Sequence, residues 1–210
     1  MQFNKLVVFN KINIPVPKQQ IFSRLGYNIH KTQISDYVLN SIENTINYAA
    51  SLCSITVCYK IAGLKIIDNS IEIDNNIKFQ SLKLAEFLKE CDRIILTAAT
   101  SGKDIMEKIE NHHKMSETVI IDATGSEMAD AGLDWLNNYL LTETRRKNMI
   151  MTKNRFSAGY GDFAIENQKI IFEILELEKL GIELTKTFML IPEKTVTAIY
   201  GLKTKRDCLI

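Results

Sequence analysis

The sequence predicts an α+β (mixed α/β) fold, with a twisted, antiparallel-rich sheet flanked by helices in a single domain over residues 1–210. Short runs rich in β-branched residues are interspersed with amphipathic stretches whose apolar residues recur every three or four positions. These strands and helices do not alternate as repeated β-α-β units would, which favours antiparallel pairing. The chain has no linker rich in Pro, Gly or Ser, and its 210 residues fit one domain of about 100–200 residues.

The first third of the chain is expected to contain one strand, two helices and a group of strands. Pro15 and Pro17 end an initial strand-like segment, which has no signal-peptide cleavage site. A short helix at 21–25 is stopped by Gly26, and a longer one at 35–52 starts with Ser35 as its N-cap. Three strand-like runs follow, at 55–61, 64–67 and 71–73.

The rest of the chain mixes further helices and strands. Leu82, Ala85 and Leu88 mark a helix, a strand follows at 93–98, and Gly102 opens another helix. The longest helix is expected at about 117–141, where its small residues suit close approach by another backbone. The remaining elements are a strand at 149–152, the loop RFSAGYGDF, an amphipathic helix at 166–180 closed by Gly181, and a strand over TVTAIYGL.

Composition argues against several classes of function. The net charge is +1 with acidic and basic residues interspersed, so neither the basic stripe nor a known module of a nucleic-acid-binding protein is expected. No apolar run reaches the roughly 18 residues that span a bilayer. The four cysteines form no CxxC pair, so reduced thiols and a cytoplasmic location are expected. These cysteines are Cys53, Cys58, Cys91 and Cys208.

Two weaker motifs favour structural over functional interpretations. Residues 100–104 (TSGKD) lack the upstream glycine of a phosphate-binding P-loop, and Asp104 replaces its Ser or Thr. His112 and His113 are adjacent near a helix end, so their side chains point in different directions, and no other ligand has the spacing of a metal site. We therefore expect no metal site.

The loop at 155–162 carries the least ordinary combination of residues. Arg155 is a planar cation suited to a carboxylate. Gly159 and Gly161 permit a positive φ or close approach by a ligand. Asp162 stands where the next helix should begin, a favourable N-cap position. From these residues alone, a capped turn between a strand and a helix, with a solvated Arg155, remains the alternative to a binding loop.

This loop, Gln168 and the end of the chain resemble the activation domain of cobalamin-dependent methionine synthase. The family pattern reads like R-F-S-P-G-Y-G-D, then Q, an apolar helix and a phrase like M-x-P-x-K-S-V-S-A, which here is MLIPEKTVTA. The segments CDRIILTAATSG and IIDATGSEMADAGLDWL are similar to the family's strand, loop and small-residue helix. The resemblance is strong over residues 81–202 and weak over the first eighty, and it suggests a free-standing version of the domain.

The resemblance implies binding of S-adenosylmethionine and presentation of its methyl group to a cobalamin held by a partner protein. There, an electron reduces cob(II)alamin, and capture of the methyl group gives methylcobalamin. It also implies the partners: a cobalamin-dependent methionine synthase or another corrinoid protein, and a flavodoxin- or ferredoxin-type reductant. Because cobalt is the nucleophile, no catalytic acid, base or nucleophile is expected in this chain.

The site residues follow from matched positions in the family. Arg155 matches the arginine that holds the ligand carboxylate, and Ser157, Gly159 and Tyr160 match the wall around the ligand. The remaining matches are Tyr200, which falls on an aromatic position near the ligand in the last strand, and Asp130, which falls on an acidic position of the long helix.

This chain departs from the family at two points. Ala158 replaces the usual proline, and the acidic residue of the family's N-terminal part that meets the ligand ammonium has no identified counterpart. Two hypotheses follow. The chain is an accessory reactivation factor acting in trans on a synthase, or a non-catalytic interaction module that docks on a corrinoid protein without binding S-adenosylmethionine.

Overall fold

A seven-stranded sheet forms the centre of the computed structural model, which describes residues 3–27, 32–74 and 76–205. The strands follow the order β4-β3-β2-β5-β9-β6, with β1 also paired to β2, and each of these pairings is antiparallel. The predicted antiparallel-rich α+β architecture is therefore confirmed. The strands are β1 (Val7–Phe9), β2 (Thr56–Ile67), β3 (Ser70–Ile73), β4 (Ile77–Gln80), β5 (Arg93–Thr100), β6 (Met149–Met151) and β9 (Thr195–Thr204).

Strand β2 unites two runs that the sequence analysis treated as separate strands. Its first part pairs with β1 and β5, while residues 64–67 pair with β3. Gly63, at the junction, stays in register opposite Arg93, and its N–H donates to the Asp74 carboxylate at 2.8 Å. This side-chain acceptor satisfies the backbone where the strand changes partners, so the strand continues without a turn.

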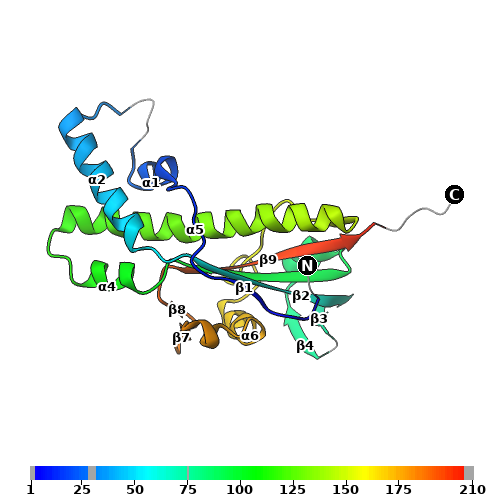
Figure 1. Cartoon of the computed structure of the whole chain (residues 1–210). Coiled ribbons are helices and arrows are strands. Elements are labelled where there is room, and N and C mark those ends of the chain that lie inside the picture. The colour runs from blue at the N-terminus through cyan, green and yellow to red at the C-terminus, as the bar shows by residue number, and fades with distance from the viewer. Residues whose placement is uncertain (1–2, 28–31, 75, 206–210) are drawn as a thin grey trace.

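The described residues form six α-helices, some on the faces of the sheet and others stacked on helix α5 (Figure 1). The 32-residue helix α5 lies along one face, whereas α3 and α6 cover the other. The helices are α1 (Lys18–Arg24), α2 (Asp36–Leu52), α3 (Leu82–Leu88), α4 (Asp104–Glu110), α5 (Met115–Arg146) and α6 (Gln168–Ile174). Within the described residues, no helix combines the length and apolar character needed to cross a membrane.

The sheet is buried on both faces, which explains the nearly continuous apolar sequence of β5. Ile95 and Ala99 pack with α5, while Ile94 and Leu96 pack in the cluster that contains α3 and α6. Successive strand residues point to opposite faces, so both sets must be apolar. The small residues of α5 serve this packing: a Cβ on Gly132 would lie 3.0 Å from Ile55 Cγ2.

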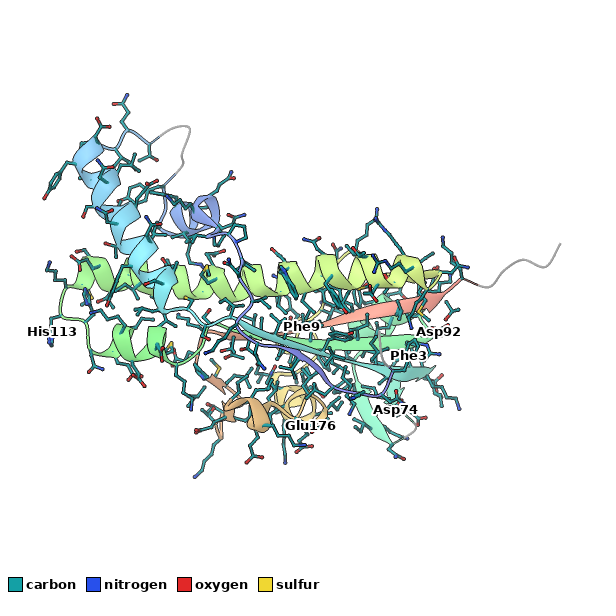
Figure 2. All side chains as sticks on the ribbon, viewed as in Figure 1. Phe3, Phe9, Asp74, Asp92, His113 and Glu176 are labelled. Carbon is teal, nitrogen blue, oxygen red and sulfur yellow. The ribbon has the colours of Figure 1, made fainter. Side chains whose placement is uncertain are left out.

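The N-terminal half of α5 packs against helices instead of the sheet. Ile21 and Phe22 of α1 share a buried cluster with Ile42 and Ile46 of α2 and with Ala123 of α5. In the C-terminal half of α5, the rings of Trp135 and Tyr139 contact Phe9 of β1 (labelled in Figure 2), with centroids 5.3 and 5.0 Å away. The two ends of α5 are thus fixed by different partners.

The prediction of one continuous helix over residues 166–180 is wrong. The chain forms a 3-10 turn (η1, Ile165–Asn167), then α6, and a second 3-10 turn (η2, Leu177–Leu180), with Glu176 in the left-handed region at φ 50°. Leu175 and Leu177 are both fully buried. Two residues that are two positions apart face different sides of a continuous helix, so the break at Glu176 lets both enter the core. Gly181 ends this segment at φ 71°, as predicted.

The described cysteines are free thiols. Burial raises the pKa of Cys53 and Cys58 to about 12 and that of Cys91 to about 11, which keeps them protonated and unreactive at neutral pH. Cys208 lies outside the described residues.

Candidate functional site

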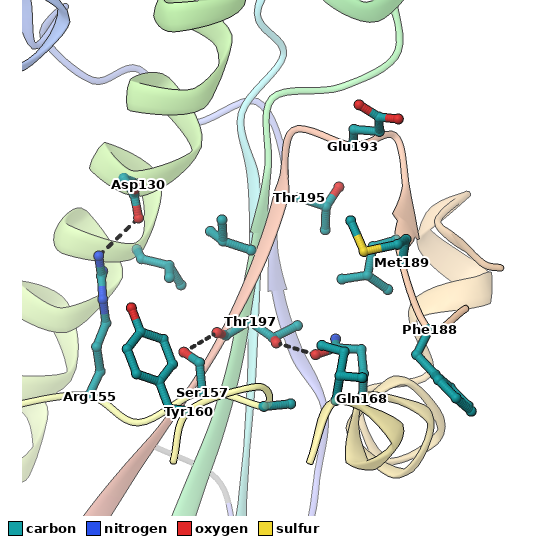
Figure 3. Close-up of a pocket in the computed structure, with 15 residues that line it drawn as sticks. Asp130, Arg155, Ser157, Tyr160, Gln168, Phe188, Met189, Glu193, Thr195 and Thr197 are labelled. Atoms are coloured by element: carbon teal, nitrogen blue, oxygen red, sulfur yellow. Dashed lines mark hydrogen bonds and ion pairs between the residues drawn. The ribbon is translucent and has the colours of Figure 1, made fainter. Parts of the chain in front are cut away.

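A cavity of about 410 Å³ opens between α5, the loop after β6 and the start of β9 (Figure 3). This volume lies within the range of about 300–1,000 Å³ that is typical of small-molecule sites. Its polar lining consists of Asp130, Arg155, Ser157, Tyr160, Gln168, Glu193, Thr195 and Thr197. Its apolar lining consists of Leu133, Ala158, Ile165, Phe188, Met189, Leu190 and Val196.

The predicted binding loop forms one wall of this cavity. Phe156 bridges to Ile199 of β9 through two backbone hydrogen bonds of 2.9 and 2.7 Å, which fix the start of the loop. Gly159 adopts φ 90° and Gly161 adopts φ 63°, backbone conformations that only glycine accepts without strain. Phe163 is fully buried beneath the loop. The expectation that these glycines supply positive φ is confirmed.

The N-cap role predicted for Asp162 is assigned to the wrong helix. The next helical turn begins at Ile165, with Ala164 before it. Asp162 instead accepts hydrogen bonds from Ser81 Oγ at 2.6 Å, from Leu82 N at 2.6 Å and from Lys83 N at 3.3 Å. The Ser81 hydroxyl, followed by these backbone donors, lowers the pKa of Asp162. The carboxylate therefore joins the binding loop to the N-terminus of α3.

Arg155 is held by two carboxylates of α5. Its guanidinium lies 2.9 Å from Asp130 Oδ1 and 3.3 Å from Asp134 Oδ1, and Asp130 lies 4.0 Å from the guanidinium of Arg24. Burial raises the pKa of Asp130 above its ordinary value, although the Arg155 charge acts in the opposite direction. Arg155 is exposed, as the alternative of a solvated arginine expected, but its guanidinium is also paired with two carboxylates.

The other predicted site residues differ in their placement. Ser157 lines the cavity and donates to the carbonyl of Thr197 at 2.9 Å. Tyr160 lines it as well, 69% exposed, beside Arg155. Tyr200 is only 3% exposed and is not among the lining residues. Burial raises the pKa of its hydroxyl, and the Arg155 guanidinium beside it counteracts the shift. Arg155, Ser157, Tyr160 and Asp130 thus meet at one cavity, whereas Gly159 and Tyr200 are not among its lining residues.

Gln168 and Thr197 are lining residues to which the sequence analysis assigned no role. Thr197 Oγ1 donates to Gln168 Oε1 at 2.9 Å, and both side chains are more than nine-tenths buried. The Gln168 Nε2 donor has no hydrogen-bond partner among the described residues. The one signal in the sequence was the place of Gln168 after the RFSAGYGD loop, in the pattern that carries the resemblance.

The site is equipped for binding, since its lining residues offer charges, hydrogen-bond donors and apolar surface. In the part of the chain that the structure describes, no group of three His, Cys, Asp or Glu residues is placed to hold a metal ion. Asp130 and Glu193 outnumber Arg155 among the charged lining residues, so the cavity favours a ligand with a net positive charge.

Comparison with known proteins identifies the fold. No protein-family model matches the sequence, and no curated protein matches it. Among solved structures, the crystal structure of the MetH reactivation domain bound to AdoHcy is similar, with a TM-score of 0.67 and 14% sequence identity. The match covers 94% of this chain and 78% of that one. The chain therefore has the fold of the MetH reactivation domain, as the resemblance implied.

Proposed function

We propose that this protein binds S-adenosylmethionine in the cavity beside Arg155 and supports the reductive remethylation of cob(II)alamin in a partner protein. The observation that carries the proposal is a ligand-sized cavity, lined by Arg155, Ser157 and Tyr160 of the resembling loop, in a chain with the fold of an AdoHcy-bound reactivation domain. AdoHcy is the product that S-adenosylmethionine leaves after it has given up its methyl group.

Charge supports this ligand. S-adenosylmethionine carries a carboxylate, an ammonium and a sulfonium, so its net charge is positive, which suits a lining with two acids and one base. Arg155 offers a planar pair of donors to the carboxylate. Asp130, 2.9 Å from Arg155, offers an acceptor for the neighbouring ammonium. The face of the Tyr160 ring suits the sulfonium.

The role of the chain in the reaction is positioning. One electron from a flavodoxin- or ferredoxin-type donor, together with the methyl group of the ligand, converts the partner's cob(II)alamin to methylcobalamin and leaves AdoHcy. Holding the sulfonium at an exposed rim, where Tyr160 is 69% exposed, would bring the methyl group within reach of a corrin on another molecule. The partner would be a cobalamin-dependent methionine synthase or another corrinoid protein.

Two measurements test the proposal in order. Calorimetry with S-adenosylmethionine and with AdoHcy should show saturable binding to the purified protein. The protein should then be mixed with a cobalamin-loaded synthase lacking its own activation domain, S-adenosylmethionine and a low-potential reductant. The corrin spectrum should change from cob(II)alamin to methylcobalamin. If the spectrum stays unchanged at a saturating concentration of this protein, with a functional corrinoid partner from the same genome, the protein has no role in remethylation.

One observation favours the second function, an interaction module that docks on a corrinoid protein without this ligand. Arg155 is already paired with Asp130 and Asp134, so a ligand carboxylate must compete with both. If these ion pairs are retained for structure alone, neither S-adenosylmethionine nor AdoHcy will bind, while the protein will still form a complex with the cobalamin-loaded partner. This function would be established if calorimetry detects no binding of either ligand and the two proteins co-elute.

A further inference from the structure

The two ends of the cavity differ in chemistry. Arg155 and Asp130 place opposite charges at one end, on the side of α5 (Figure 3). At the other end, Gln168 of α6 lies near Met189, which directly precedes β8 (Leu190–Ile191) of the small β7-β8 hairpin, whose other strand is β7 (Glu183–Leu184). Arg155 and Asp130 are paired with each other at the first end, whereas the second end offers the Met189 side chain, the Gln168 amide and, farther along, the Glu193 carboxylate.

The Gln168 amide is held in a fixed orientation. The residue is 5% exposed, and the hydroxyl of Thr197 donates to its Oε1 at 2.9 Å. Thr197 is fixed in turn by its place in β9, where its carbonyl accepts from Ser157 at 2.9 Å. Gln168 begins α6, whose buried residues Ile171 and Ile174 anchor the helix in the core. The amide therefore cannot turn away without breaking a buried hydrogen bond.

Gln168 lines the cavity, and its Nε2 donor is buried without a hydrogen-bond partner among the described residues. A buried donor that loses its bond to water and gains none in return is costly. An apolar side chain of similar length at position 168 would occupy the same space without that cost. The presence of an amide at this position is explained if an acceptor atom of a ligand completes its hydrogen bonds.

We propose that Gln168 is a specificity-determining residue whose Nε2 donates a hydrogen bond to a ring nitrogen of a purine base bound at this second end. This inference rests on the proposed function, because it takes the ligand carboxylate to lie at Arg155 and the rest of the molecule to extend along the cavity toward Gln168. A flat heterocycle suits the end that Met189 borders, since a thioether adapts to an aromatic face. The amide then distinguishes an adenine ring nitrogen from a carbon at the same position.

The test uses AdoHcy and its 1-deaza, 3-deaza and 7-deaza analogues, each of which replaces one ring-nitrogen acceptor by C–H. Calorimetry on the wild-type protein should show that one of the three analogues binds at least about tenfold more weakly than AdoHcy. The Gln168→Met variant should bind AdoHcy at least about tenfold more weakly than the wild type does. The variant and the wild type should bind that one analogue equally, because the bond is absent from both complexes.

The controls separate this inference from folding and from the proposed function. Asn137→Leu removes another buried amide with an unpartnered atom, one that does not line the cavity, and should leave all four affinities unchanged. Equal affinity of the wild type for all four ligands overturns the role of Gln168, whether or not Gln168→Met folds. A uniform loss across the four ligands in the variant overturns it as well. No binding of AdoHcy or S-adenosylmethionine to the wild type refutes the proposed function itself.

Discussion

The guanidinium of Arg155 lies 2.9 Å from the carboxylate of Asp130, 25 residues earlier in the chain, and this pair forms the charged end of the cavity. The pairing orients both groups before any ligand arrives, which lowers the entropy lost on binding. The ion pair also competes with the ligand, because Arg155 and Asp130 must each give up part of their contact with the other to bind it. The first two predictions address the two members of this pair.

Replacing Arg155 with alanine should weaken S-adenosylmethionine and AdoHcy binding about ten- to a hundred-fold. A hydrogen bond to a charged group typically contributes about 1.5–3 kcal/mol, and the substitution also leaves Asp130 with only the more distant Arg24. Isothermal calorimetry provides the measurement. Arg146→Ala, which breaks an exposed pair with Glu143, is the matched control and should leave affinity unchanged. Equal affinities for the wild type and Arg155→Ala would contradict the assignment.

Ligand affinity should depend on pH through Asp130. Only the ionised carboxylate attracts an ammonium, and burial raises its pKa, so affinity should fall as pH decreases, starting at a higher pH than for an ordinary aspartate. The Asp130→Asn variant should bind more weakly at neutral pH and lose this dependence. Calorimetry over the range in which circular dichroism shows a folded protein measures both. The same pH dependence in wild type and variant would assign it to another group.

Gly159→Val should weaken ligand binding more than it weakens the fold. An added Cβ would meet only Ile165 Cδ1 at 3.6 Å, so the damage comes from φ 90°, which costs about 1–3 kcal/mol for a branched residue. Relief of that strain would displace the loop that bears Ser157 and Tyr160. Gly181→Val is the control: its φ is 71°, nothing lies within 4 Å of its Cβ, and it lies outside the loop that bears Ser157 and Tyr160.

Affinity and melting temperature, measured on both glycine variants, separate the two effects. Both should melt at a lower temperature than the wild type, but only Gly159→Val should lose affinity. A folded Gly159→Val protein that binds as the wild type does would show that the backbone of this loop plays no part in the site.

Asp162→Asn should destabilise the protein at neutral pH and lose this effect in acid. Hydrogen bonds, first from Ser81, lower the pKa of Asp162 in the folded state. Its contribution to stability is therefore fully present above the unfolded-state pKa of about 3.9 and is lost as pH falls through the lower folded-state value. Urea unfolding at several pH values should give curves for variant and wild type that converge in acid. If the free energies of unfolding of the variant and the wild type differ by the same amount at every pH, the charge of Asp162 does not contribute to stability.

Tyr200→Phe should reduce ligand affinity only modestly, and only while Arg155 is present. The phenol lies beside Arg155, and the ring is part of the buried cluster that packs α5 on the sheet. Phenylalanine keeps this packing and removes the hydroxyl. Calorimetry on the single variants and on the double variant with Arg155→Ala gives the coupling. Additive effects of the two substitutions would show that Tyr200 acts independently of Arg155.

Local sequence patterns determined most of the elements and the backbone of the loop. Val38, Ile42, Ile46 and Ala49 recur at helical spacing, and α2 spans Asp36–Leu52. The positive φ at Gly159 follows from a property of glycine that holds wherever the residue stands. Such features depend on neighbours within a few positions, so the sequence reports them directly.

The tertiary structure alone decided which side chains meet. Asp162 caps a helix whose Ser81 lies 81 residues earlier, and Thr197 orients Gln168 across 29 residues. The helical conformation is also interrupted at Glu176, which allows Leu175 and Leu177 both to be buried. These outcomes depend on how distant segments pack and on which buried polar groups need partners, and no periodicity in the sequence specifies that. For the same reason, the sequence identified the binding loop and, by resemblance, Asp130, whereas only the fold placed Gln168 and Thr197 beside them.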